Sequence, residues 1–352
     1  MTATKRVLDS QEGPARKQRG AAVHPRVSLC VCAAAVVGNC QNLEQITHKV
    51  YELARAASMY NVREVVVLSL DPPRTAGTSK GEKLSDSMLV ATLLQYFVTP
   101  PYLVRSVFKK RFHKYFQHAE KLPRLAQLPF MRQDTPREGK SRYREGVSVA
   151  MERPAKMSKQ KQFQQTKYVN VGASELLELR AQLVPLNVRV TVDVVEHKIV
   201  SPAEAYGDHV GAEAAFGYHV RVADTLVDLF LKSPCNYVQT LWCAAEEYWQ
   251  GQGRHHSSHG SPTAVSAAGI VREGDLLLIV GKWDHLRASL ARGQDQLAEG
   301  EGEEAETPAV SSPGQLLDGE LLLPAAVMRG NMPTADATLA ALTRLECMLE
   351  RE

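Results

Sequence analysis

The residues of this 352-residue chain best suited to chemistry are arginines gathered in one turn-rich segment, PFMRQDTPREGKSRYREGVSVA, residues 129–150. A guanidinium donates two parallel hydrogen bonds to a phosphate, so such a cluster favours contact with the phosphates of a nucleic acid. The segment also holds Asp134, Glu138 and Glu145, so a surface ion network is the alternative interpretation. The predicted phosphate-binding residues are Arg132, Arg137, Arg142 and Arg144.

A second basic stretch, Met151–Lys167, follows directly and contains Lys159 and Lys161 beside one aromatic residue. Cations that follow a nucleic-acid backbone, next to a ring that stacks on a base, are typical of single-strand binding. We therefore predict that Lys159 and Lys161 contact RNA, with a solvated hairpin loop as the alternative. Because the net charge of the chain is only +3, positive charge matters where it clusters, here and at Arg105–Lys121.

The sequence predicts no metal site. His255, His256 and His259 lie in a Gly/Ser/Gln-rich loop without a carboxylate or cysteine at tetrahedral spacing, which favours a solvated linker. Cys30 and Cys32 alternate in an apolar run, so burial in a core is favoured over metal binding. The six cysteines have no framework-like spacing, which argues against a secreted disulfide scaffold.

Two adjacent carboxylates, Glu246 and Glu247, could act as a paired acid and base. Neither has an evident desolvating partner in the sequence, so the start of a solvated helix is the favoured interpretation. The sequence contains no P-loop, GxGxxG or nucleophile-elbow motif, so nucleotide hydrolases and dehydrogenases lose support. The longest apolar run, Val27–Val37, is too short to span a bilayer, and we expect no membrane partner.

The elements that must position these residues begin with a βαβ unit. Arg26–Val37 is predicted as a buried strand, Leu43–Tyr60 as an amphipathic helix and Val62–Leu70 as a second strand. This order implies a parallel sheet. A helix is predicted over Leu84–Val98 and a basic helix over Tyr102–Lys121.

Downstream, the pattern changes from helical to strand-like and then back. From Arg144 to Gly211, β-branched residues in short runs separated by Gly and Pro are typical of a small five-strand barrel of the oligonucleotide-binding (OB) type. Strands are then predicted at Tyr237–Ala245, Asp275–Trp283 and Glu320–Met328, before a helix over Thr334–Glu352 whose leucine stripe suits packing on the sheet or on a second subunit. The predicted domains are a disordered tail (1–25), an α/β domain in two pieces (26–135 and 212–352), an inserted β domain (136–211) and disordered loops (250–268 and 294–314).

Four segments in order, MRQD from Met131, YREG from Tyr143, YVNVG from Tyr168 and GYHVRVA from Gly217, resemble the SPOUT-class RNA methyltransferase family that carries an inserted OB-like domain. The resemblance covers residues 26–350 and implies a SPOUT-like α/β fold with a C-terminal trefoil knot. It further implies S-adenosylmethionine bound in the knot, an obligate homodimer and a ribosomal RNA substrate, with uridine N3 suggested as the methylated atom. A nuclear or nucleolar location fits this role and the basic N-terminal tail, while an organelle stays open.

The resemblance also implies three cofactor loops that follow three successive strands. Backbone groups in these loops grip the adenine and methionine parts of the cofactor, which requires small residues that allow close approach. By their order in the chain, the loops follow Tyr237–Leu241, Leu276–Val280 and Leu321–Met328. The implied cofactor-binding residues are Trp242, Cys243, Ala244, Val280, Gly281, Lys282, Gly330, Asn331 and Thr334.

The loops of this chain depart from the family pattern. The first lacks an arginine and a glycine, and the second has Lys282 in place of the second glycine of a pair. Trp242 and Lys282 place bulk where the cofactor should meet the backbone, and the missing arginine removes a group that could stabilise developing charge. Two functions therefore stay open: an active RNA methyltransferase, and an inactive relative that binds RNA as an assembly or scaffold factor. No catalytic residue is assigned.

Overall fold

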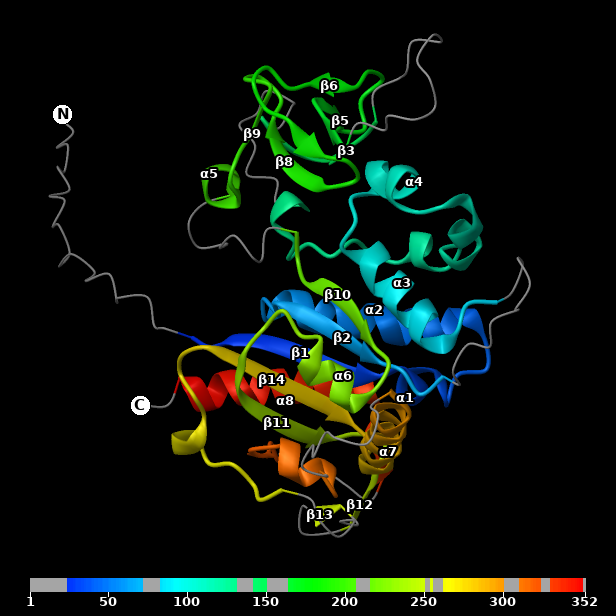
Figure 1. Ribbon diagram of the computed structural model, residues 1–352, viewed down its shortest axis with the longest axis vertical. Coiled ribbons are helices and arrows are strands. Elements are labelled where there is room, and N and C mark those ends of the chain that lie inside the picture. The colour runs from blue at the N-terminus through cyan, green and yellow to red at the C-terminus, as the bar shows by residue number, and fades with distance from the viewer. Residues whose placement is uncertain are drawn as a thin grey trace, which may run out of the picture.

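A six-stranded parallel sheet with the order β10-β2-β1-β14-β11-β15 forms the centre of the molecule (Figure 1). Its strands are β1 (Arg26–Cys32), β2 (Glu64–Leu68), β10 (His219–Ala223), β11 (Tyr237–Ala244), β14 (Asp275–Gly281) and β15 (Gly319–Glu320). The computed structural model describes residues 24–71, 83–131, 142–150, 164–206, 216–250, 254–255, 262–300, 310–323 and 330–350. The sheet confirms the predicted mixed α/β class and the parallel βαβ start.

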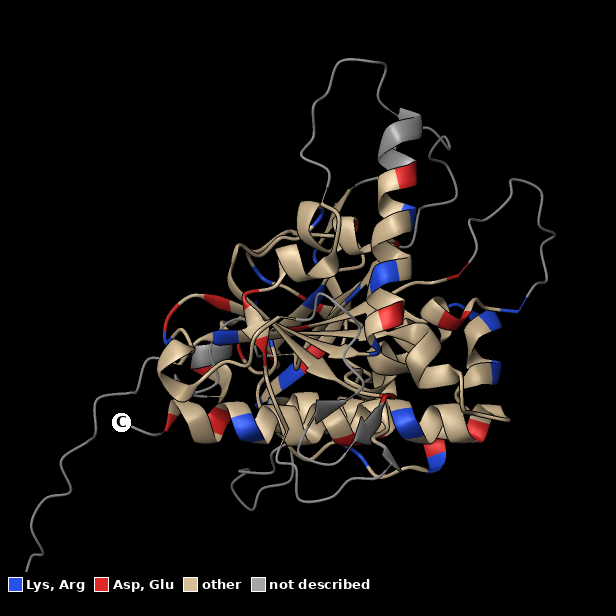
Figure 2. Cartoon of the chain, turned by 90° about the horizontal axis from the view of Figure 1, so that it is seen from below, with Lys and Arg blue, Asp and Glu red and all other residues tan. Residues whose placement is uncertain are grey.

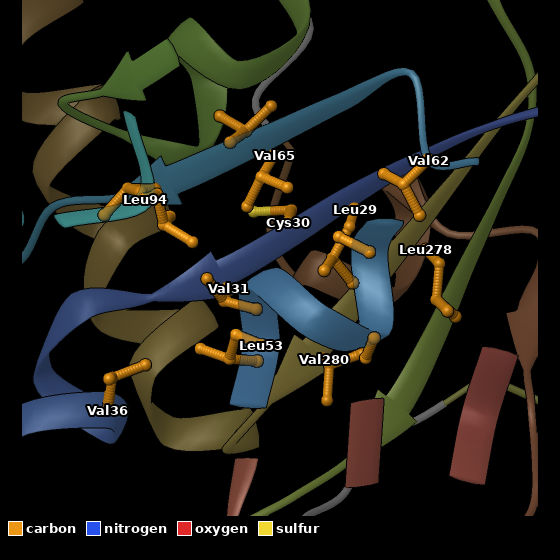
Figure 3. Close-up of a cluster of buried hydrophobic side chains, with 14 of the residues drawn as sticks. Leu29, Cys30, Val31, Val36, Leu53, Val62, Val65, Leu94, Leu278 and Val280 are labelled. Atoms are coloured by element: carbon orange, nitrogen blue, oxygen red, sulfur yellow. The ribbon is translucent and has the colours of Figure 1, made fainter. Parts of the chain in front are cut away.

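The central strands are apolar along most of their length, after a charged residue at the start of each: Arg26 in β1, Glu64 in β2 and Asp275 in β14. Every residue of β2 and β14 is buried, as expected for parallel strands covered on both faces. Figure 3 shows side chains of β1, including Leu29 and Cys30, packed with Val65 of β2 and Leu278 of β14. Burial raises the pKa of the Cys30 thiol well above its usual value. The interpretation of Cys30 and Cys32 as core residues is confirmed, because both are buried.

Three long helices confirm predicted ones. They are α2 (Leu43–Met59), α3 (Asp86–Phe97) and α8 (Thr334–Leu349), and α2 contacts both of the others. Helix α2 begins where the Asn42 side chain accepts from the backbone N–H of Gln45, at 2.9 Å. Helix α3 begins with the corresponding bond from Met88 to Ser85. Within the described residues, no helix combines the length and apolar content that crossing a membrane requires.

The first predicted strand is too long. Strand β1 ends at Cys32, and the next five residues form the short helix α1 (Ala33–Val37). Three successive alanines explain the change, because alanine has the highest helix propensity and the chain has left the sheet. The last turn closes with a hydrogen bond of 2.8 Å from the Gly38 N–H to the carbonyl of Ala34.

The single basic helix predicted over Tyr102–Lys121 is wrong. The segment folds as short pieces: η1 (Pro101–Leu103), α4 (Val104–Val107), η2 (Lys110–Tyr115) and η3 (Ala119–Lys121). Phe108 is extended, with φ −102° and ψ 135°, and so interrupts any continuous helix. Aromatic and β-branched residues lose side-chain freedom in a helix, and here they are used instead to anchor successive turns in the core.

Two further predicted boundaries are wrong, because helix α7 occupies Trp283–Gly300. The strand predicted to reach Trp283 ends at Gly281, and the first seven residues of the predicted loop 294–314 are helical. Leu286 and Leu290, one turn apart, are both buried and hold the helix on the core. The predicted strand Glu320–Met328 is described only as far as residue 323. Its described part overlaps the short edge strand β15 at Glu320.

Residues 143–199 form a separate antiparallel sheet with the order β6-β5-β3-β8-β9. Its strands are β3 (Tyr143–Ser148), β5 (Tyr168–Asn170), β6 (Leu177–Glu178), β8 (Arg189–Asp193) and β9 (Lys198–Ile199), beside a ribbon of β4 (Gln165–Thr166) and β7 (Val184–Pro185). A small apolar core of its own supports the sheet: Val169, Val171, Leu179, Val190 and Val192. Five strands were expected in this region. Helix α5 (Pro202–Tyr206) packs beside β8, and η4 (Pro129–Met131) is the last described element before this sheet (Figure 1).

A buried ion pair within the antiparallel sheet, between Arg189 of β8 and Glu145 of β3, also contacts the α/β layer. The Arg189 guanidinium lies 3.2 Å from the Glu145 carboxylate and donates at 2.8 Å to the carbonyl of Val98, which ends α3. Thr191 and Tyr206 each donate to the same carboxylate at 2.7 Å. Burial raises the pKa of Glu145, although Arg189 and the hydroxyls oppose this. Glu145 therefore takes no part in the surface ion network considered for residues 129–150.

Candidate functional site

The carboxyl ends of β11 and β14 lie side by side at one edge of the parallel sheet. In the register of this pair, Cys243 lies opposite Val280 and Ala244 opposite Gly281. A third segment joins them, since β16 (Gly330–Asn331) pairs with β12 (Tyr248–Gln250), just after β11, in a small sheet that also contains β13 (Arg254–His255). The three segments predicted to hold a cofactor are thus neighbours. Ligands of open parallel sheets bind at this edge.

Trp242, Cys243 and Ala244 are strand residues and not a loop. All three are buried, and the Trp242 carbonyl accepts from the N–H of Leu321 at 2.7 Å beside edge strand β15. The first loop therefore begins at Ala245, three residues later than predicted, because the ladder to β14 continues to Ala244. Burial also raises the pKa of the Cys243 thiol well above its usual value.

The bulk of Trp242 lies inside the core. Its ring packs 4.8 Å, centroid to centroid, from that of Trp283, and its Nε1 donates to the carbonyl of Gly281 at 3.0 Å. The tryptophan side chain therefore holds the ends of β11 and β14 together from inside the core, by a hydrogen bond and by ring packing. The expectation that its side chain fills the space where a cofactor meets the backbone is wrong.

Gly281, the last residue of β14, is buried and yet has space beside its Cα. A Cβ built on it would meet no atom within 4 Å, apart from its chain neighbours, in the described structure. Its carbonyl accepts from the N–H of Ala245 at 3.3 Å, which ties together the first two strand ends. A group that needs close approach to the backbone has room at this position. Val280, before it, is fully buried in the core.

Lys282 turns outward along the start of helix α7. Its side chain is 41% exposed, and its Nζ lies 3.8 Å from a carboxylate oxygen of Asp284. Nearby, the pKa of His285 is lowered by burial and then by the Lys282 charge. Two polar atoms in this turn, Trp283 Nε1 and His285 Nδ1, are buried without a hydrogen-bond partner in the described structure.

Glu246 and Glu247 are not the start of a solvated helix. The Glu246 carboxylate accepts from the Thr334 N–H at 3.0 Å, at the beginning of α8, and from the side chain of Asn39 at 3.0 Å. The Glu247 carboxylate accepts from the Trp283 N–H at 2.6 Å, at the beginning of α7. A carboxylate at a helix N-terminus satisfies free N–H groups and complements the helix dipole. The pair thus clamps the two helices that follow the second and third segments.

The third segment is only partly described. Gly330 and Asn331 are described by their backbone, which pairs with β12, while Thr334 is buried as the first residue of α8. The backbone N–H of Glu246 donates to the carbonyl of Met332 at 2.8 Å, so the first and third segments are bonded directly. Residues 324–329 lie outside the described structure.

Glu246 adopts a left-handed backbone conformation, with φ 58°, which disfavours a residue with a large side chain. We expect Glu246→Ala to lower the free energy of unfolding by about 1 kcal/mol, because it removes the acceptor at the α8 N-terminus and keeps the backbone strain. Glu246→Asn should lose less, since asparagine tolerates this conformation. Urea denaturation measures both.

The control is Glu273→Ala, an exposed glutamate in the turn before β14. It should leave the unfolding midpoint unchanged. Equal losses for Glu246→Ala and Glu273→Ala would contradict the clamp.

The predicted RNA-binding residues fall in different places. Arg142 is paired with Asp193 at 2.7 Å and with Glu196 at 2.5 Å, and Arg144 lies over the ring of Tyr102, 4.6 Å from its centroid. Arg142 therefore belongs to an ion network, although with acids other than those considered from the sequence. The remaining four, Arg132, Arg137, Lys159 and Lys161, lie outside the described residues, as do His256 and His259.

A cavity of about 490 Å³ lies along α7, beginning three residues after Gly281. Its polar lining comes from Asp284, Arg287 and Gln294 on the helix and from Ser311 and Ser312 on the opposite segment, before η7 (Pro313–Leu316). This volume is within the range of small-molecule sites. In such a lining, an arginine can donate to a phosphate, and a neighbouring carboxylate can accept a hydrogen bond from the N–H of a base.

The chain is similar to known proteins over most of its length. A family model described as "Putative RNA methyltransferase" matches residues 26–345. A putative methyltransferase of Saccharomyces cerevisiae is 39% identical over 90% of this chain and 92% of its own length, and a second from the same yeast is 32% identical over 91% and 88%. The human 28S rRNA (uridine-N(3))-methyltransferase is 28% identical over 64% of this chain and 59% of its own.

Proposed function

Because the chain belongs to the RNA methyltransferase family matched over residues 26–345, we propose that it transfers a methyl group from S-adenosylmethionine to N3 of a uridine in ribosomal RNA. The observation that carries the proposal is the convergence of three segments at the sheet edge. Hydrogen bonds of their own backbone and side chains link these segments, through Glu246 and Gly281. The substrate is inferred from the printed activity of the human, fly and mouse relatives.

The described residues fit the proposed cofactor. The space beside Gly281 allows a ligand to approach the backbone, and the buried Trp283 Nε1 has no acceptor in the described structure. Gly281, Lys282 and Thr334 are the implied residues that would hold it, together with the backbone of residues 245, 330 and 331. The cofactor supplies a methyl group activated on a sulfonium.

The chain's own contribution is alignment. Methyl transfer is an in-line displacement, for which a fixed geometry of acceptor and donor supplies most of the rate. Glu246 and Glu247 fix the starts of α8 and α7 against the first segment, so the three segments keep one relative position. We propose that the acceptor uridine enters the cavity along α7, where Asp284 is placed to accept its N3–H and Arg287 to bind its phosphate.

Several finer features are proposed with this function. The chain passes from edge strand β15 to α8, which packs on β11, β14 and α2, and this path supports the trefoil knot implied by the family resemblance. The antiparallel sheet with its own core supports an inserted OB-like domain at 136–211. A homodimer, RNA contact by Arg132, Arg137, Arg144, Lys159 and Lys161, and a nucleolar location complete the proposal.

Calorimetric titration with S-adenosylmethionine tests the cofactor part of the proposal. We expect saturable binding of one cofactor per chain, because the strand ends retain room for it. Absence of binding at millimolar cofactor, with and without RNA, would exclude methyl transfer. The inactive RNA-binding alternative would then hold, although no feature of the described site favours it.

A further inference from the structure

The short helical pieces after α3 carry a set of exposed cations that the site described above does not use. In residues 105–114, aromatic and cationic side chains alternate, with the sequence RSVFKKRFHK. Between Asp86 and Glu120 the sequence contains no acidic residue. We call the exposed cations of this segment the cationic platform: Arg105, Lys109, Lys110, Arg111 and Lys114.

The aromatic residues of the segment fix its backbone to the core. Phe116 is fully buried, and its ring stacks on Tyr96 of α3 with 4.4 Å between centroids. Phe108 packs edge-on against Phe116 at 4.8 Å, and the Tyr115 hydroxyl accepts from the Leu84 N–H at 3.1 Å. With the rings directed inward, the cations between them are left on the surface. The platform is therefore held in place before any partner binds.

The platform is not neutralised by neighbouring acids. Within the described residues, none of its five cations is in an ion pair, whereas cations of the antiparallel sheet are paired: Arg142 with Asp193 and Glu196, Lys167 with Glu178, and Lys198 with Glu196 and Glu204. Two platform cations lie over rings of the same segment, Arg111 over Phe112 at 4.8 Å and Lys114 over Tyr115 at 5.0 Å. Seen from below, the α/β layer mixes charges of both signs (Figure 2).

The platform is continuous with the antiparallel sheet. The Asn170 side chain, at the end of β5, donates to the Ser106 hydroxyl at 2.8 Å, and the Tyr102 hydroxyl donates to the carbonyl of Glu145 in β3 at 3.1 Å. Gly172 packs closely on Tyr102, because a Cβ there would lie 2.4 Å from the ring. In Figure 1, α4 lies beside β3 and β5. A long anion on the platform would extend onto this sheet.

We propose that the cationic platform is a docking surface for RNA phosphates. The proposal rests on the proposed function for the identity of the polyanion, and it relocates the main phosphate contacts from Arg142, which is paired, to residues 105–114. Five unpaired cations on a fixed surface match the regular negative charge of a nucleic-acid backbone. Aromatic anchoring keeps them at constant spacing without the entropic cost of ordering a loop.

The test compares two double variants of the full-length protein. The platform variant, Lys110→Ala with Arg111→Ala, removes two platform cations. The control, Arg55→Ala with Lys232→Ala, removes an arginine of α2 and the lysine at the end of α6 (Leu226–Leu231). Affinity for a labelled RNA hairpin and for labelled polyuridylate is measured by fluorescence anisotropy across a salt series. Cofactor affinity, from the titration described above, is measured in parallel.

We expect the platform variant to bind RNA about 20-fold more weakly near 0.1 M salt. The slope of log affinity against log salt concentration should be smaller by about two, because binding with two fewer phosphate contacts releases fewer counterions. The control should retain wild-type affinity and slope. Unchanged RNA affinity in the platform variant, or an equal loss in the control, overturns the proposal. Unchanged RNA affinity with lost binding of polyglutamate would assign the platform to an acidic protein instead.

The result separates this proposal from the proposed function. If the protein binds no S-adenosylmethionine but the platform variant loses RNA affinity, methyl transfer fails and the docking surface stands. If cofactor binding is intact and RNA affinity does not depend on the platform, the docking surface fails alone.

Discussion

Gly281→Leu is expected to weaken cofactor binding, and with it methyl transfer at limiting cofactor, while the protein stays folded. A side chain at this position enters the space beside the end of β14, where a Cβ meets no atom within 4 Å outside its chain neighbours in the described structure. The apo protein therefore accommodates it, and the loss of a flexible glycine from the unfolded chain even favours folding by about 0.5 kcal/mol. The cofactor, in contrast, must compete with the new side chain for the same space.

The expected loss of cofactor affinity is about 10- to 100-fold, the equivalent of overpacking a filled site by roughly 1–3 kcal/mol. Gly281→Ala should fall between wild type and Gly281→Leu, and this graded series is the internal control. Calorimetry gives the affinity, thermal unfolding without cofactor gives the stability, and RNA anisotropy shows that docking is intact. If Gly281→Leu binds S-adenosylmethionine as tightly as wild type, the cofactor does not use this strand end.

Arg189→Met should cause the largest loss of stability of any single change considered. The guanidinium is held by Glu145, by the carbonyl of Val98 and between the rings of Phe130 and Phe216, at 5.0 and 4.8 Å. Methionine preserves the apolar contacts but leaves the Glu145 carboxylate buried without its cation. Removing one partner of a buried pair costs about 3–5 kcal/mol, and chemical denaturation measures it.

Arg142→Met is the matched control, since Arg142 directly precedes β3 and also pairs with acids but is about half exposed. It should shift the unfolding midpoint little. A double-mutant cycle with Glu145→Gln then isolates the coupling between Arg189 and Glu145. Equal effects of Arg189→Met and Arg142→Met would show that burial of the Arg189–Glu145 pair does not raise its contribution to stability.

The parallel frame could be predicted because its signals are local. The apolar runs within Val62–Leu70 and Asp275–Trp283, and the capped helices after Asn42 and Ser85, specify their own structure. Segment 102–121 could not be predicted in the same way. Its helical pattern of apolar residues is real, but aromatic packing against α3 divides it into short turns, and that packing depends on tertiary contacts.

The candidate site was predicted as a set of segments, not as a set of contacts. Gly281 was predicted because the family resemblance implied a cofactor loop after this strand, where a small residue lets a ligand approach the backbone. The clamping roles of Glu246 and Glu247 were missed, since their partners Thr334 and Trp283 are distant in sequence. The signal that could have found them is an acidic pair directly after a buried strand, where helix N-termini gather. Burial of Glu145 was equally invisible, because Arg189 follows in another strand.

The most direct test of the proposed function is methylation of RNA by the purified protein. Ribosomal RNA from cells that lack the protein is incubated with the purified protein and with S-adenosylmethionine that carries a deuterated methyl group. The RNA is then digested to nucleosides, which are separated and identified by mass spectrometry. We expect labelled N3-methyluridine, at a level that falls when Gly281→Leu replaces the wild type at limiting cofactor. No labelled nucleoside at saturating cofactor, or label on another atom, would contradict it.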